Sequence, residues 1–174
     1  MAVGPDPEIE YICATLEEEA ARISPANTPG RGGAYLSTVK FTDRPGYGYR
    51  DEANINLVER SALLLWPLGK GNGISPHTSV ERRHKLRTLW LGIVEGTTGR
   101  ETQRKAIALE DDLSRMLLNN TQRDRPSAAG ITNIYGVDTA EEGPLPIEWN
   151  YTQDGQIYIG SFSALYDVEY RAQY

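Results

Sequence analysis

The sequence predicts an α+β domain in which two helices pack on a mainly antiparallel, twisted sheet with an extended β-arm. Two segments carry apolar residues three and four positions apart, which is the spacing of a helix with one buried face. Other segments alternate apolar and polar residues, as half-buried strands do. The order helix, strand, two long strands, helix and terminal hairpin is typical of the α+β class. The length of 174 residues suits one domain over residues 1–174.

The first helix is predicted to begin at Pro7, because Asp6 can cap it and proline fits the first helical position. Ser24 and Pro25 end it. Its apolar stripe comprises Ile9, Ile12, Cys13, Leu16, Ala20 and Ile23. Because Cys13 lies within this stripe, we interpret it as a small core residue and not as a nucleophile.

Three strands are predicted before the second helix. Tyr35 to Phe41 alternates apolar and polar side chains, Ile55 to Trp66 is a long apolar run, and Glu81 to Glu95 is apolar on both faces in its second half. The chain has 17 glycines and 10 prolines, which predicts long loops near residues 42–54, 67–80 and 121–146. We expect the segment 67–80 to form the flexible tip of a two-stranded arm.

The second helix follows a capping-box pattern in which Thr98 precedes Glu101 by three residues. The acidic run Glu110, Asp111 and Asp112 is interpreted as a solvated helix face, because consecutive helical positions diverge by ~100° and do not converge on one ion. A short strand is expected at 131–137. A hairpin then closes the chain, with strands at 147–151 and 156–170 joined by a turn at Asp154 and Gly155.

The net charge of −6 is unevenly distributed. Residues 1–30 hold six acids and one base, and residues 126–174 hold seven acids and one base. Residues 31–95 hold ten bases and six acids. This balance disfavours binding to DNA by bulk charge and is compatible with self-association, in which the basic middle of one copy meets an acidic end of the next. A solvated surface with a chance pattern is the alternative.

Composition also excludes several classes of protein. The single cysteine excludes an intramolecular disulfide and a thiolate metal cluster. We see no signal peptide and no apolar run near the ~20 residues that span a bilayer, so we expect a soluble protein made in a reducing cytoplasm. The two histidines, His77 and His84, lack metal-site spacing, and Gly69 to Ser75 lacks the spacing of a phosphate-binding loop. We therefore expect no enzyme activity, no cofactor and no metal.

The basic run Arg82 to Arg87 is the sharpest polar feature of the sequence. In a strand, Arg83, Lys85 and Arg87 share one face at ~6.8 Å spacing. This face could meet acids of a neighbouring subunit, solvent or a DNA backbone, and a protein contact is the preferred hypothesis. The candidate residues for contacts with a subunit, a partner or a lumen are Arg82, Arg83, Lys85, Arg87, Glu17, Glu18 and Lys70.

In this order of elements the chain resembles the tail terminator proteins of tailed bacteriophages, of the minor tail protein U type. The residues that carry the resemblance are Pro7-Glu8-Ile9-Glu10 at the first helix and the closing run Phe162-Ser163-Ala164-Leu165-Tyr166-Asp167-Val168-Glu169-Tyr170-Arg171. The resemblance covers most of the chain in element order. It carries over no catalytic residue, because the family has none.

The resemblance implies a structural virion protein, made in the host bacterial cytoplasm and located in the tail or neck. Such proteins form a homo-hexameric ring that caps the tail tube, stops its polymerisation and joins the tail to the head connector. The implied partners are the tail tube protein and a head-completion or connector protein, with genomic DNA passing through the lumen without specific binding and no membrane. The alternatives are another neck or head–tail joining protein, or a DNA-contacting accessory protein that uses Arg82 to Arg87. A small hydrolase using the acidic clusters or His84 has no support in residue spacing.

Overall fold

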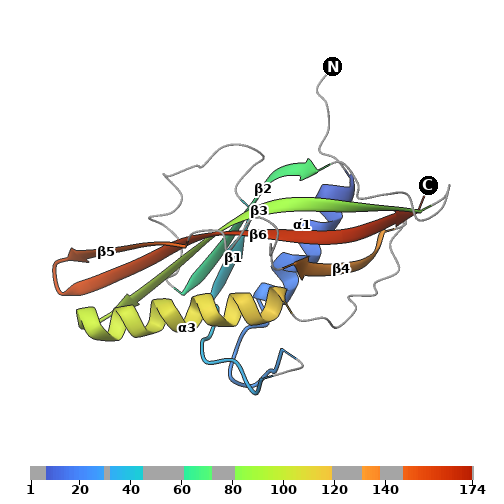
Figure 1. Ribbon diagram of the computed structural model, residues 1–174. Coiled ribbons are helices and arrows are strands. Elements are labelled where there is room, and N and C mark those ends of the chain that lie inside the picture. The colour runs from blue at the N-terminus through green and yellow to red at the C-terminus, as the bar shows by residue number, and fades with distance from the viewer. Residues whose placement is uncertain are drawn as a thin grey trace.

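The computed structural model describes residues 7–29, 32–44, 61–71, 81–118, 131–137 and 147–173 (Figure 1). Two helices in these ranges pack on a mixed sheet, which confirms the α+β class. The elements are α1 (Pro7–Ala20), β1 (Phe41–Asp43), β2 (Ala62–Gly71), β3 (Glu81–Gly96), α3 (Gly99–Leu117), β4 (Ile131–Val137), β5 (Glu148–Asp154) and β6 (Ile157–Gln173).

The sheet has the strand order β1-β2-β3-β6-β4, and β5 pairs with β6 as well. The pairing of β1 with β2 is parallel, and the other four pairings are antiparallel. Strands β3 and β6 run side by side in unbroken register from Glu81↔Gln173 to Gly96↔Tyr158. Strands β4 and β5 follow one another along the opposite edge of β6. The β1 edge and the β5 edge therefore lie on opposite sides of the sheet (Figure 1).

The main core lies between the sheet and the two helices. The predicted stripe of α1 is buried there, and α3 contributes its own stripe. Because side chains alternate along a strand, β2 sends Leu63 and Leu65 to this side and Leu64 and Trp66 to a smaller cluster on the other face. The second half of β3 likewise contributes to both clusters, as its two apolar faces predict.

Glycine is required at one central position of the sheet. Gly92 of β3 lies opposite Phe162 of β6. A Cβ atom at Gly92 would come within 2.1 Å of the Phe162 ring, so the ring occupies the space that a side chain would fill. This close packing lets Phe162 reach the main core, where it is buried.

The structure corrects three predicted boundaries. The strand predicted over Tyr35–Phe41 is wrong, because only Phe41–Asp43 pairs with β2 and the preceding residues form an irregular segment. Strand β2 does not end at Trp66, since it continues to Gly71 after a register shift between Pro67 and Gly69. Residues 67–71 of the predicted loop therefore belong to a strand. Both helices, the strand at 131–137 and the terminal hairpin are confirmed, but α1 ends at Ala20 and not at the predicted Ser24 and Pro25.

Other predicted features lie outside the described residues. These are the start of the long strand at 55–60, most of the loop at 42–54, the arm tip at 72–80, and the remainder of the loop at 121–146 apart from β4. In the part of the chain that the structure describes, no helix is long and apolar enough to cross a membrane.

Candidate interaction surfaces

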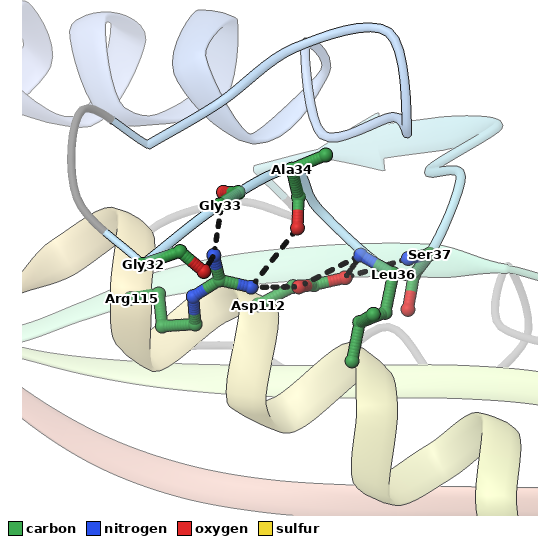
Figure 2. Close-up of polar contacts among 7 residues, drawn as sticks. All are labelled: Gly32, Gly33, Ala34, Leu36, Ser37, Asp112 and Arg115. Atoms are coloured by element: carbon green, nitrogen blue, oxygen red, sulfur yellow. Dashed lines mark hydrogen bonds and ion pairs between the residues drawn. The ribbon is translucent and has the colours of Figure 1, made fainter.

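A buried carboxylate on α3 holds the irregular segment that precedes β1 (Figure 2). Asp112 is fully buried. One of its oxygens accepts hydrogen bonds from the backbone N–H groups of Leu36 (2.9 Å) and Ser37 (2.6 Å), and the other lies 3.1 Å from the Leu36 nitrogen. In a sheet, a neighbouring strand would accept the backbone N–H groups of residues 36 and 37. Here the Asp112 carboxylate accepts them instead. The prediction that Asp112 lies on a solvated helix face is therefore wrong.

Arg115, one helical turn after Asp112, completes this contact. Its guanidinium donates to the carbonyls of Gly32 and Gly33 at 2.7 Å each, and to that of Ala34 at 3.3 Å. It also lies 3.3 Å from the Asp112 carboxylate. The pair thus fixes residues 32–37 against α3 through their backbone groups (Figure 2). We call Asp112 and Arg115 the α3 clamp.

A pocket of about 310 Å³ opens beside the α3 clamp. It lies between the segment 36–40, the end of β3 and the middle of α3, and its apolar lining comes from Leu36, Val94, Ala108 and Leu109. Leu36 is 67% exposed, which is high for a leucine held by a buried carboxylate. Lys40, Lys105 and Glu95 also line the pocket, with Ser37, Thr38 and Ser61. We call this cavity the loop–helix pocket.

Lys105 connects the pocket to the start of α3. Its ammonium group lies 2.8 Å from the Glu101 carboxylate and donates to the Glu95 carbonyl at 3.1 Å. The Glu101 carboxylate also accepts from the N–H and the hydroxyl of Thr97, and the Glu101 N–H donates to Thr98. The bond to Lys105, followed by those from Thr97, lowers the pKa of Glu101 to about 2. The predicted cap is thus confirmed for Thr98, which accepts from the Glu101 N–H, whereas the Glu101 carboxylate accepts from Thr97 and not from the N–H of Thr98.

The hairpin of β5 and β6 forms the opposite edge of the sheet. All seven residues of β5 are exposed, and β6 is its partner strand. Trp149 and Tyr151 share one face and are 38% and 42% exposed. The Trp149 ring lies 5.6 Å from the Phe162 ring, which anchors this exposed face to the core. At the tip, Asp154 pairs with Ile157, which is 43% exposed.

The predicted basic strand finds acids within the same chain. Lys85 lies opposite Glu169 and Arg87 opposite Asp167 in the β3–β6 register. The Arg87 guanidinium contacts both oxygens of the buried Asp167 carboxylate, at 2.9 and 3.2 Å. Such a two-point contact fixes the orientation of the Arg87 guanidinium against the Asp167 carboxylate. We expected the basic strand to meet acidic residues of a neighbouring subunit, such as those of its C-terminal region. Instead, Arg87 pairs with Asp167 in the C-terminal region of the same chain.

Other members of the predicted contact set are dispersed. Arg82 and Arg83 lie in β3 and Lys70 in β2; the structure describes their backbone positions alone. Glu17 of α1 pairs with Arg44 at 2.5 Å, and Glu10 pairs with the same arginine at 2.6 Å. Burial lowers the pKa of Arg44, but the two carboxylates outweigh it and the net shift is upward.

Glu18 is exposed on α1, one position from Glu17. The predicted contact residues therefore do not converge on one site in the described part of the molecule. The strand pairing brings Lys85 and Arg87 together on β3, whereas Glu17 and Glu18 lie on α1.

The buried reactive groups fit structural roles. Desolvation raises the pKa of the Cys13 thiol to about 12, so it stays protonated at neutral pH. His84 is buried and stacks on Tyr170 with ring centroids 5.3 Å apart. Within the described ranges, no group of three or more histidines, cysteines and acids is placed to hold a metal ion.

Sequence reasoning missed the α3 clamp, the loop–helix pocket and the exposed aromatic pair of β5. One signal for the clamp was available. Asp112 lies three residues after Leu109 and four before Met116, so helical spacing places it beside the buried stripe.

A scan against models of protein families finds no family that matches the chain, and a search of curated proteins finds no match.

Proposed function

We propose that this protein is a ring-forming structural protein that caps a phage tail tube, stops its polymerisation and joins the tail to the head connector. The observation that carries the proposal is the β5 hairpin. It is a seven-residue edge strand, exposed along its whole length, with two aromatic side chains on one face. Aromatic residues at an open strand edge are typical of a surface that another protein covers.

The edge strand has few of the features that keep edges from associating. It contains no proline and no lysine, and its register with β6 is unbroken from Glu148↔Ser163 to Asp154↔Ile157. Protein edges that remain in solvent are commonly short, bulged or guarded by lysine. By contrast, the opposite edge strand β1 has only three residues. These features support a role in assembly for the β5 edge.

Polar residues elsewhere support a structural role. The α3 clamp holds backbone, Arg87 pairs with Asp167, and Arg44 pairs with Glu10 and Glu17. Each of these charged groups is used to fix the fold of one copy. Together with the resemblance in element order to tail terminators, this use of charged groups favours a structural protein that assembles with other copies over an enzyme.

Light scattering during size-exclusion chromatography, over a range of protein concentrations, tests the proposal. We expect a discrete oligomer near six times the monomer mass of 19.3 kDa, visible as rings by negative-stain electron microscopy. A chain that stays monomeric at high concentration contradicts the proposal. Labelling of phage particles should place the protein at the neck, and its absence from particles contradicts the assignment to the tail.

The alternative of a DNA-contacting accessory protein is tested in the same preparation. Since Asp167 neutralises Arg87 and Glu169 lies opposite Lys85, we expect weak affinity for duplex DNA at about 50 mM salt with a shallow salt dependence. Tight binding that weakens steeply as salt rises would support the alternative instead.

A further inference from the structure

We propose that the β5–β6 hairpin tip of one copy docks in the loop–helix pocket of the next copy. This inference rests on the proposed function, because it names the contact through which the ring closes. The two surfaces differ in shape and lie toward opposite edges of the sheet: the hairpin at the β5 edge and the pocket beside the segment that leads into β1. A closed ring needs such a pair of unlike, complementary surfaces on every copy.

The apolar parts of the two surfaces match. The pocket presents the exposed side chain of Leu36 over a lining of Val94, Ala108 and Leu109. The tip of the β5–β6 hairpin lies at one end of the molecule (Figure 1), and its Ile157 is 43% exposed. A cavity of about 310 Å³ has room for the Ile157 side chain. Docking would remove both Leu36 and Ile157 from water, which favours association.

The charges of the two surfaces are also complementary. Strand β5 carries Glu148 and Asp154 and no base. The pocket carries Lys40, Lys105 and Glu95; since Lys105 is already paired with Glu101, Lys40 is the base that a carboxylate of the tip would meet. Because Asp154 pairs with Ile157 across the turn, one face of the tip offers a carboxylate and an apolar side chain together. Two hairpins facing each other would bring like charges together, so the charges favour the pocket of the next copy.

The pocket wall is held in place before docking. Asp112 bonds the backbone of Leu36 and Ser37, and Arg115 bonds the carbonyls of residues 32–34 (Figure 2). The segment that lines the pocket thus loses little conformational freedom on binding. Pre-organisation of this kind raises affinity without further contacts.

Cross-linking between single-cysteine variants tests the inference. We would prepare Leu36→Cys and Ile157→Cys in the full chain, confirm unchanged thermal unfolding, and treat each with a short bismaleimide. The native Cys13 is buried and should not react. Each variant alone should give no cross-link, whereas an equimolar mixture should give a covalent dimer. Leu68→Cys, at an apolar position that is 53% exposed, is the matched control and should not cross-link with Ile157→Cys.

The outcomes separate this inference from the proposed function. Rings that form without the mixed cross-link overturn the docking contact and leave the ring proposal standing. Cross-linking of Ile157→Cys with itself also overturns it, since hairpins would then meet each other. A chain that is monomeric at every concentration overturns both. As a second test, Asp154→Lys and Lys40→Glu should each weaken assembly at least fivefold, and combining the two changes should restore it; weakening that persists in the combined variant contradicts the contact.

Discussion

Strand β6 differs sharply between its two ends. Its C-terminal half lies between β3 and β4, and Asp167, Val168, Glu169 and Tyr170 are all buried there. Its N-terminal half lies between β3 and β5, and there the partner strand β5 is exposed along its whole length (Figure 1). At one end β6 thus lies between two strands of the core, and at the other end it supports an exposed strand. The comparison predicts that fold stability and the proposed assembly can be changed separately in this chain.

The ring pair of Phe162 and Trp149, whose planes are tilted by 52°, marks the boundary between the two regions. Phe162→Ala should lower the free energy of unfolding by about 3–5 kcal/mol, because it removes a fully buried ring and leaves a cavity. Trp149→Ala should lower it by only about 1 kcal/mol, because the indole is already partly exposed, but should weaken assembly. Urea unfolding and light scattering measure the two effects. Equal losses of stability in the two variants would contradict the expected difference between the core and the exposed hairpin.

The α3 clamp belongs to the stable region although it holds an irregular segment. Asp112→Ala should destabilise the fold by about 2–3 kcal/mol, because two backbone N–H groups lose their acceptor. Asp111→Ala, at the exposed neighbouring position, is the matched control and should change stability by less than about 0.5 kcal/mol. Chemical unfolding of both variants provides the measurement. If the two losses are similar, Asp112 does not act as a buried anchor.

The Arg87–Asp167 pair tests whether the basic strand serves the fold. Arg87→Ala should destabilise by about 1–3 kcal/mol, because it leaves a buried carboxylate without its charged partner. Arg104→Ala, which removes an exposed arginine of α3, controls for the loss of charge. Assembly measured by light scattering should be unaffected once the folded fraction is matched. Loss of assembly with normal stability would show instead that Arg87 contacts a neighbouring copy.

The smallest expected effect concerns pH and the start of α3. The pKa of Glu101 falls from its ordinary value of 4.5 to about 2 in the folded chain. A carboxylate with a lowered pKa stabilises the fold above its unfolded pKa, and this contribution disappears as pH falls from about 4.5 to 2. Glu101→Gln should therefore be less stable at pH 6 and should lose less stability on acidification. Urea midpoints at pH 6 and pH 2.5 measure the change; identical pH dependence in both proteins contradicts it.

Elements with a strong local pattern could be predicted from the sequence. The stripes of α1 and α3, the terminal hairpin and the two apolar faces of β3 are all local signals, and the structure bears them out. The turn itself lies one residue later than predicted, at Gly155 and Gln156, because Asp154 still pairs with Ile157. The strand at Tyr35–Phe41 failed because Tyr35 and Val39 are buried without a strand partner. Alternation reports which side chains are buried, and it does not report whether the backbone is paired in a sheet.

The surfaces were harder to predict because they depend on register. That Arg87 meets Asp167 follows from the alignment of β3 with β6, which joins positions 80 residues apart. Composition showed acids and bases in separate segments and could not show that these segments pair within one chain. The loop–helix pocket likewise combines residues from four separate stretches of sequence. The aromatic pair of β5 was visible as sequence, but its exposure depends on β5 lying at the open edge.

The central position of β6 has a consequence for synthesis. Residues 97–156 separate the end of β3 from the start of β6, so a ribosome adding about 5–20 residues per second needs several seconds to supply the partner strand. During that time the nascent chain holds β3 with one edge unfilled. Strand β6, the last of the described strands to be synthesised, then completes the middle of the sheet. The same strand forms one side of the hairpin. A chain interrupted before residue 157 can neither complete its core nor present the hairpin, so we expect truncated products to stay out of the proposed ring.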